Sequence, residues 1–154
     1  METTSIKEDQ LTLASITHLS VLSKFFIPLG NFIIPLVIWV INKEKSFIDK
    51  HARAALNFQI SLLIYYISIL FILVAIFIVT AISYSSNYFL ITKDYLEFNP
   101  FDNPTYFPFI ILVFVGLTIF FGLFILELYA VIKAAKHASE GLEYKYPLCI
   151  NFIR

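Results

Sequence analysis

The chain has 154 residues, of which 59% are hydrophobic and 14% charged, and its mean hydropathy is +0.82. Soluble domains contain roughly 45–50% apolar and about 25% charged residues, so this composition indicates an integral membrane protein with a single domain over residues 1–154. A formal net charge of zero without a basic run argues against nucleic acid as a partner. The single cysteine, Cys149, excludes an internal disulfide and a cysteine-based zinc site.

The first apolar block, Leu11 to Ile41, is too long for one straight crossing and contains Pro28 and Gly30, which together end a helix. We therefore predict two short membrane segments, at about residues 11–27 and 31–41, with a turn between them. The alternative places residues 7–24 on the membrane surface as an amphipathic helix and lets residues 25–42 cross alone. The first reading gives a bundle of four transmembrane helices in all, and the second gives three.

Two longer apolar blocks follow, and each exceeds the roughly 20 residues needed to cross a bilayer. They predict helices at about residues 47–83 and 107–140, joined by an outer loop at 84–106 and followed by a tail at 141–154. Thr118 and Gly122 form a pair of small residues that predicts a close approach to a neighbouring helix.

Basic residues favour the cytoplasmic side of a membrane, and four of them lie between the second and third segments, whereas the outer loop has Lys93 alone. The tail adds further lysines. The charge pattern therefore predicts a multi-pass protein of the bacterial plasma (inner) membrane with both termini in the cytoplasm. The four clustered basic residues are Lys43, Lys45, Lys50 and Arg53.

Three stretches resemble a family of small bacterial membrane proteins of unknown function: 14–20 with 30–39, His51 to Gln59, and 146–153. That family is grouped with the channel-like subunit of the chloroplast inner-envelope protein import translocon. The resemblance implies four membrane helices and a link to protein translocation or insertion. It implies no catalytic or ligand-binding residue.

Polar side chains within the apolar segments are costly in lipid and are candidates for function. Glu127 is expected near the inner end of the last helix, where Arg53 or His51 would pair with it, either to fix the helix register or as a proton or cation site. The full set of intramembrane candidates is His18, Lys24, Asn57, Gln59 and Glu127.

The other members of this set have structural and functional readings of their own. Lys24 is expected at the outer end of the first segment, with its ammonium reaching the interface. His18 is expected to hydrogen-bond to Ser15, Ser20 or another helix, or to relay protons. Asn57 and Gln59 point to different faces, so one is expected to bridge to another helix and the other to meet lipid headgroups or a partner.

Charged residues at the inner ends of the long helices form a candidate docking surface, with a solvated helix end as the alternative. These residues are Asp49, Lys50, His51, Arg53, Lys133, Lys136, His137 and Glu140. No Gly-x-Ser-x-Gly turn, phosphate-binding glycine loop or metal-ligand spacing is present, so we expect no enzyme activity, no metal and no cofactor.

The sequence thus favours a non-catalytic accessory or scaffold subunit of a bacterial inner-membrane assembly. We expect contact with membrane lipids and with a protein partner in the same membrane or a second copy of the chain. The alternative is a small oligomeric channel or carrier in which Glu127, His18 and Lys24 line a polar path.

Overall fold

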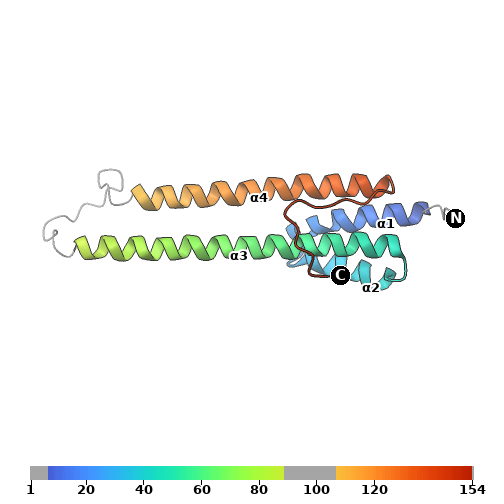
Figure 1. Ribbon diagram of the computed structural model, residues 1–154, viewed down its shortest axis with the longest axis horizontal. Coiled ribbons are helices and arrows are strands. Elements are labelled where there is room, and N and C mark those ends of the chain that lie inside the picture. The colour runs from blue at the N-terminus through green and yellow to red at the C-terminus, as the bar shows by residue number, and fades with distance from the viewer. Residues whose placement is uncertain (1–6, 89–106, 154) are drawn as a thin grey trace. The chain divides into compact units, whose positions relative to one another are not determined.

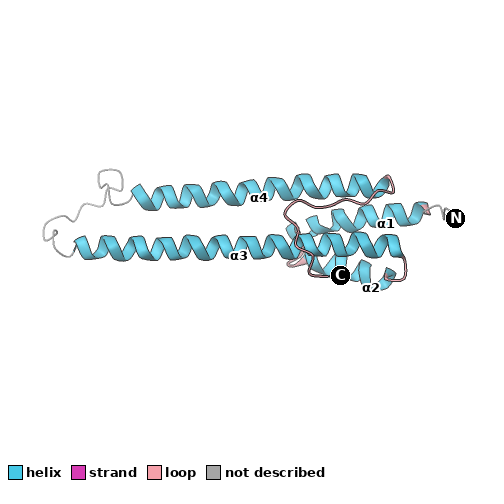
Figure 2. Cartoon of the chain, viewed as in Figure 1, coloured by secondary structure: helices cyan, strands magenta, loops and turns pink. Residues whose placement is uncertain are grey.

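The computed structural model describes residues 7–88 and 107–153, and every regular element in them is helical (Figures 1 and 2). In chain order these are α1 (Glu8–Leu19), the 3₁₀ helix η1 (Ser20–Phe25), α2 (Gly30–Asn42), α3 (Ser46–Tyr88) and α4 (Phe107–Ser139). The predicted outer loop lies outside the described residues, apart from 84–88, where α3 continues. The all-helical class is confirmed, and the number of membrane crossings stays a prediction.

The first apolar block folds as a helical hairpin. The α-helix ends at Leu19, earlier than the predicted 27, and η1 carries the chain to Phe25. Leu29 adopts a left-handed conformation with φ 59°, which reverses the chain just before α2 begins at Gly30. A Cβ at Gly30 would collide with Ser23, so only glycine lets η1 and α2 approach this closely.

The two long helices are suited to crossing a membrane. The stretch Ser46–Ser83 of α3 and the whole of α4 each contain an 18-residue window with a mean hydropathy of 3.0, of which 6% is buried inside the protein. No charged residue occurs at 60–83 or at 107–126. Side chains that are this apolar and this exposed require a lipid or protein environment.

The chain divides into two compact units. Unit 1 comprises residues 1–64 and 124–154, and unit 2 comprises 65–123, so α3 and α4 each contribute to both. In unit 1, α1 and α2 lie alongside the first turns of α3 (Figure 1). Small buried residues recur at Ala130, Ala134 and Ala138, one helical turn apart on α4, which lets neighbouring backbones come close.

Unit 2 consists of the apolar parts of the two long helices. Tyr66 stacks on Phe120 with ring centroids 5.5 Å apart, and Phe77 meets Phe109 edge-on at 5.2 Å. The predicted close approach at Gly122 is not made within the described part of this chain, because a Cβ built there meets no atom within 4 Å. The close approach is instead at Gly116, where a Cβ would lie 2.9 Å from a methyl carbon of Leu73.

Candidate functional site

Four polar side chains from four elements of unit 1 form one hydrogen-bonded group, which we call the Glu127 cluster. Lys24 of η1 donates to Glu127 Oε2 at 2.5 Å, and Gln59 of α3 donates to Oε1 at 3.1 Å. Gln59 in turn accepts a hydrogen bond of 2.8 Å from the side-chain amide of Asn31 in α2. The cluster therefore joins η1, α2, α3 and α4 through a single buried carboxylate.

The partner predicted for Glu127 is wrong. Arg53 pairs with Asp49 one turn away, and His51 contacts His18, so Lys24 forms the ion pair with Glu127. The helical hairpin brings Lys24 to the carboxylate from a distant part of the sequence, which no local pattern reveals. The sequence placed Lys24 near the outer membrane surface and Glu127 near the inner one. Because their side chains are bonded, the two residues lie at the same depth.

The environment of this ion pair is largely shielded from solvent. The Glu127 side chain is 1% exposed and that of Lys24 is 24% exposed. The Lys24 ammonium also lies 5.5 Å and 6.0 Å from the ring centroids of Phe25 and Phe124. A carboxylate buried in this way is stable as an anion only with a cation and hydrogen-bond donors beside it, and Lys24 and Gln59 supply both.

Three further buried side chains form a second group, the histidine chain. The Tyr146 hydroxyl lies 2.8 Å from His18 Nδ1, and His18 Nε2 lies 2.8 Å from His51 Nδ1. Burial, together with repulsion from His51, lowers the pKa of His18 from 6.5 to about 3. His18 is therefore neutral at physiological pH, in a helix that is not among those long enough to span a membrane.

The histidine chain refines one prediction and overturns another. Of the predicted hydrogen-bond partners of His18, a neighbouring helix is confirmed. Ser15 and Ser20 instead donate to backbone carbonyls of their own helical segment. Tyr146, whose ring stacks on Phe58 at 4.2 Å, is 7% exposed and belongs to the core of unit 1.

Two polar residues of α3 hold the tail along the helix. The Asn57 side chain donates to Ile153 O and accepts from the backbone N–H groups of Phe152 and Ile153. Ser61 Oγ accepts from the Ile150 N–H at 2.8 Å. Through these bonds the side chains of α3 satisfy backbone N–H and C=O groups of the irregular tail. We call this set of bonds the tail anchor.

Asn57 and Gln59 lie on different faces of α3, as predicted, but neither side chain is placed to meet lipid headgroups. Both are buried, at 3% and 2% exposure. Asn57 binds the tail, whereas Gln59 belongs to the Glu127 cluster. The tail covers a face of α3 that the helical period alone leaves open.

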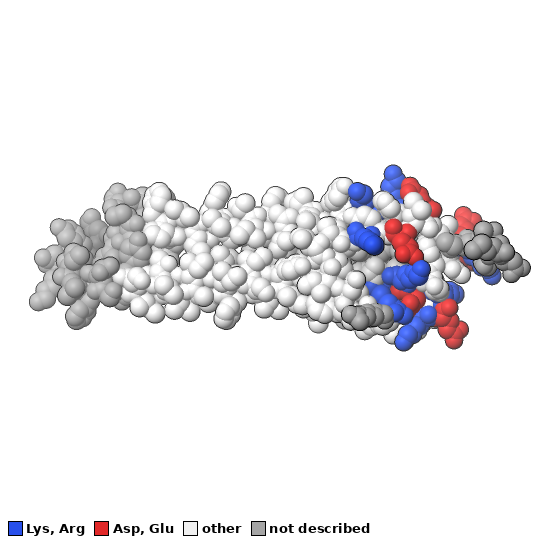
Figure 3. Space-filling model, viewed as in Figure 1, with Lys and Arg blue, Asp and Glu red and all other residues white. Residues whose placement is uncertain are grey.

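The predicted docking residues fall into two groups. His51 is buried, and Asp49 and Arg53 are half-buried: Asp49 accepts from Trp39 at 2.7 Å and pairs with Arg53 at 2.6 Å. The remaining members, together with Glu143, lie on the surface of unit 1, where charge is concentrated (Figure 3). This exposed set is Lys50, Lys133, Lys136, Glu140 and Glu143, and His137, the remaining member, is half-buried.

The exposed set and His137 make contacts near the surface of unit 1. Lys136 lies 3.9 Å from Glu140, Lys133 donates to the Tyr129 hydroxyl, and the His137 ring contacts its own helix at Lys133 O. Exposed pairs of this kind contribute about 0–1 kcal/mol. Their charges therefore remain available to a partner or to solvent.

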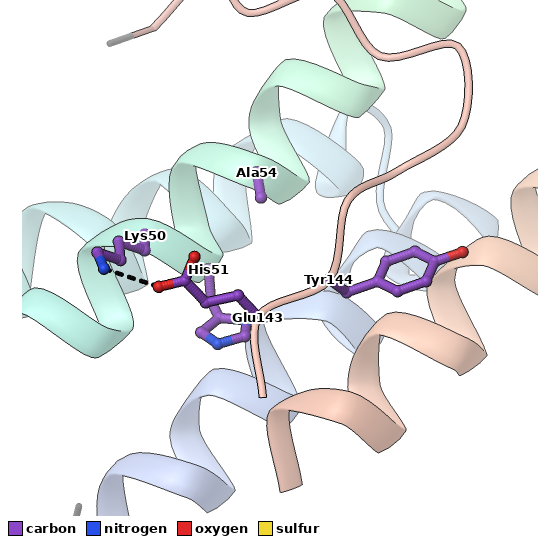
Figure 4. A pocket seen from close by; sticks show the side chains of 5 residues that line it. All are labelled: Lys50, His51, Ala54, Glu143 and Tyr144. Carbon is purple, nitrogen blue, oxygen red and sulfur yellow. Dashed lines mark hydrogen bonds and ion pairs between the residues drawn. The ribbon is translucent and has the colours of Figure 1, made fainter. Parts of the chain in front are cut away.

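A small open pocket lies at the start of α3, under the first residues of the tail (Figure 4). Lys50, His51 and Ala54 line it from the helix, and Glu143 and Tyr144 line it from the tail. Lys50 donates to Glu143 at 2.7 Å across its edge, and this bond lowers the pKa of the Glu143 carboxyl. We call it the Glu143 pocket.

Among residues 7–88 and 107–153, no group of three His, Cys, Asp or Glu side chains is placed to hold a metal ion. The expectation of no metal and no cofactor remains a prediction. Cys149 is a free thiol whose pKa burial raises, so it is mostly protonated at neutral pH.

Several residues that complete these groups were not predicted from the sequence: Asn31, Ser61, Glu143 and Tyr146. Asn31 and Ser61 did carry a usable signal, because each is a polar residue in an apolar segment and needs a partner there. Tyr146 and Glu143 carried none, since a tail without periodicity does not indicate which side chain turns inward.

The fold and these buried polar groups define a helical protein with two helices apolar and long enough to cross a membrane. Residues 9–153 match the model of the MamF/MmsF family, described as the magnetosome magnetite crystal formation protein family, and the chain belongs to this family. No curated protein and no solved structure matches the chain.

This membership corrects the resemblance inferred from the sequence. The similarity to the chloroplast translocon subunit is wrong, because the matched family covers nearly the whole chain and is a magnetosome family. The coarser part of the prediction stands: a membrane-associated protein with an accessory role. The link to protein translocation is not supported.

Proposed function

We propose that this chain is a non-enzymatic, membrane-embedded accessory protein that displays the exposed charges of unit 1 to a partner at one face of a bacterial membrane. The observation that carries the proposal is the contrast within α3 and α4. Their stretches at 60–83 and 107–126 have no charge and expose apolar side chains, whereas unit 1 holds a buried ion pair and carries exposed charges on its surface (Figure 3). About 20 residues suffice to cross a hydrocarbon core of roughly 30 Å.

In this proposal the hairpin of α1, η1 and α2 enters the membrane and returns to the same face. The Lys24–Glu127 bond supports this arrangement, because it places the end of η1 at the depth where the charge-free stretch of α4 ends. Irregular backbone at membrane depth is tolerated where neighbouring helices cover it. Two full crossings then replace the four or three predicted from the sequence.

The same face carries the lysines and arginines of unit 1 other than Lys24, so the positive-inside rule favours the cytoplasm for it and for both termini. Single cysteines introduced into a Cys149→Ala background test this topology in sealed cells. We expect Thr12→Cys, Ser46→Cys and Ser139→Cys to be protected from an impermeant maleimide, and Phe107→Cys to be labelled from outside. Labelling of Thr12→Cys alone among the first three would contradict a re-entrant hairpin.

A structural role for the Glu127 cluster supports accessory rather than transport or catalytic activity. Both carboxylate oxygens of Glu127 are already bonded, and the neighbouring amides are bonded to each other. A carboxylate held by a cation and an amide donor in this way stabilises the fold, which favours a structural role over that of a base or an ion ligand. Formation of magnetite crystals, the process in the family's description, is the first in which to test the role.

The test is purification of the tagged chain from its native membranes in mild detergent, followed by mass spectrometry. We expect a stoichiometric partner whose recovery falls when Lys133→Glu and Lys136→Glu are combined, because these exposed cations are the proposed contact. Phe121→Ala, an exposed apolar site in unit 2, is the control and should retain the partner. Recovery of the chain alone, with ion flux in liposomes that Glu127→Gln changes, would favour a channel instead.

A further inference from the structure

The histidine chain has three polar hydrogens but only two internal hydrogen bonds in which to use them. Tyr146 has one polar hydrogen, and the neutral rings of His18 and His51 have one each. The histidine chain contains two hydrogen bonds, one between Tyr146 and His18 and one between His18 and His51. One polar group at an end of the histidine chain is therefore left without a hydrogen-bond partner inside it.

The buried tyrosine decides which end this is. Tyr146 is 7% exposed and the contact of its hydroxyl is with His18 Nδ1, so its O–H donates there. His18 then carries its hydrogen on Nε2 and donates to His51 Nδ1. His51 is left with an N–H at Nε2, an atom that is buried and has no hydrogen-bond partner.

The unpartnered His51 lines the Glu143 pocket, beside a cation. Lys50 precedes His51 on α3, and its ammonium lies at the edge of the same pocket, bonded to the Glu143 carboxylate (Figure 4). Both partners of that bond are exposed, at 58% and 64%, so the carboxylate is able to move away. The pocket lining thus includes the residue that carries this buried, unpartnered N–H and a cation whose present partner is displaceable.

We propose that the Glu143 pocket binds a phosphate-type anion, with one oxygen accepting from His51 Nε2–H and another from Lys50 in place of Glu143. Charge-assisted hydrogen bonds of this kind are the strong ones in anion recognition. A metal ion is disfavoured, because a protonated Nε2 is no ligand and Lys50 repels cations. The inference does not depend on the proposed accessory role, since it rests on the pocket alone.

The direct test is nitrogen NMR of the full-length protein, labelled with ¹⁵N-histidine and solubilised in a phosphate-free maltoside detergent. Titration with sodium phosphate against sodium chloride of equal ionic strength should shift the His51 Nε2 signal and leave that of His137, which lies outside the pocket, in place. His137→Gln identifies the latter signal. An unchanged His51 signal at millimolar phosphate would overturn the proposal.

Two variants separate a built site from general attraction of anions. Lys50→Gln should weaken phosphate binding about tenfold, the effect of losing one charge-assisted bond, and Glu143→Gln should tighten it by removing the competing carboxylate. Lys136→Gln and Glu140→Gln are the matched controls, because that exposed pair lies outside the pocket. Equal effects of the pocket pair and the control pair would refute an anion site. Weaker phosphate binding by Glu143→Gln, together with a shift of the His51 signal on addition of zinc, would also refute it.

The phosphate group has two possible sources, and the lipid environment distinguishes them. In phosphatidylcholine nanodiscs doped with phosphatidic acid and free of inorganic phosphate, a shift of His51 would identify a lipid headgroup as the ligand. A shift that appears only on addition of inorganic phosphate would identify the free anion. Absence of a shift in both conditions would contradict the site.

Discussion

Units 1 and 2 are built from the same two long helices but are held together by different forces. Unit 1 buries an ion pair, two histidines and several amides, all from segments far apart in sequence. The described residues of unit 2 make aromatic contacts and a close approach at Gly116. In lipid, apolar side chains do not drive helices together, so polar contacts and close packing provide specificity. The polar groups therefore fix unit 1, while the apolar surface of unit 2 suits it to lipid.

The largest effect is expected at the centre of the Glu127 cluster. Glu127→Ala leaves the Lys24 ammonium without its anion and Gln59 without its acceptor, so we expect a loss of about 3–5 kcal/mol in the free energy of unfolding. Thermal unfolding in detergent measures this loss. Combining Lys24→Met with Glu127→Leu should recover most of it, because no charge is then buried alone. A single variant as stable as the parent would show that the cluster is not structural.

Release of the tail comes next. Asn57→Ala removes three hydrogen bonds to Phe152 and Ile153, and we expect a loss of about 2 kcal/mol and faster amide exchange in the tail. Hydrogen–deuterium exchange measured by mass spectrometry locates the change. Thr118→Ala, an exposed polar residue of unit 2 bonded only to its own helix, is the control. If exchange rises equally in both variants, the tail anchor is not what holds the segment.

Acid should weaken unit 1 before it affects carboxylates. Because His18 has a pKa of about 3 in the fold and 6.5 unfolded, the unfolded chain binds more protons between these values. The free energy of unfolding therefore keeps its full value above pH 6.5. Below pH 6.5 it falls by about 1.4 kcal/mol for each pH unit. We expect about 2 kcal/mol to be lost by pH 5. Chemical denaturation at several pH values tests this slope, which His137→Gln should leave intact. A flat profile would mean that His18 is accessible to protons in the folded chain.

The last prediction compares two glycines, and the Gly122 variant should show the smallest effect of all. Gly30→Ala forces a Cβ against Ser23 and should cost about 1–3 kcal/mol, whereas Gly122→Ala meets open space and should be neutral or stabilising by up to about 1 kcal/mol. Melting temperatures of the two variants give the comparison directly. Equal destabilisation by both would indicate that Gly122 is covered by a neighbour in the membrane.

Much of the fold follows from the sequence. The long uncharged stretches determined α3 and α4, and proline and glycine at 28 and 30 determined the turn before α2, because hydropathy and backbone freedom are local properties. The residues that matter in unit 1 were also recognisable: polar side chains such as His18, Gln59 and Glu127 are costly in an apolar segment and need partners. Their partners were not recognisable.

Only the tertiary structure decided that Glu127 binds Lys24, that His18 binds His51 and Tyr146, and that the tail lies along Asn57. Each of these bonds joins segments separated by many residues, and several arrangements satisfy the same donors and acceptors equally well. The choice among them depends on where the 3₁₀ turn of η1 and the irregular tail place their side chains, and neither has a sequence period from which that direction could be read.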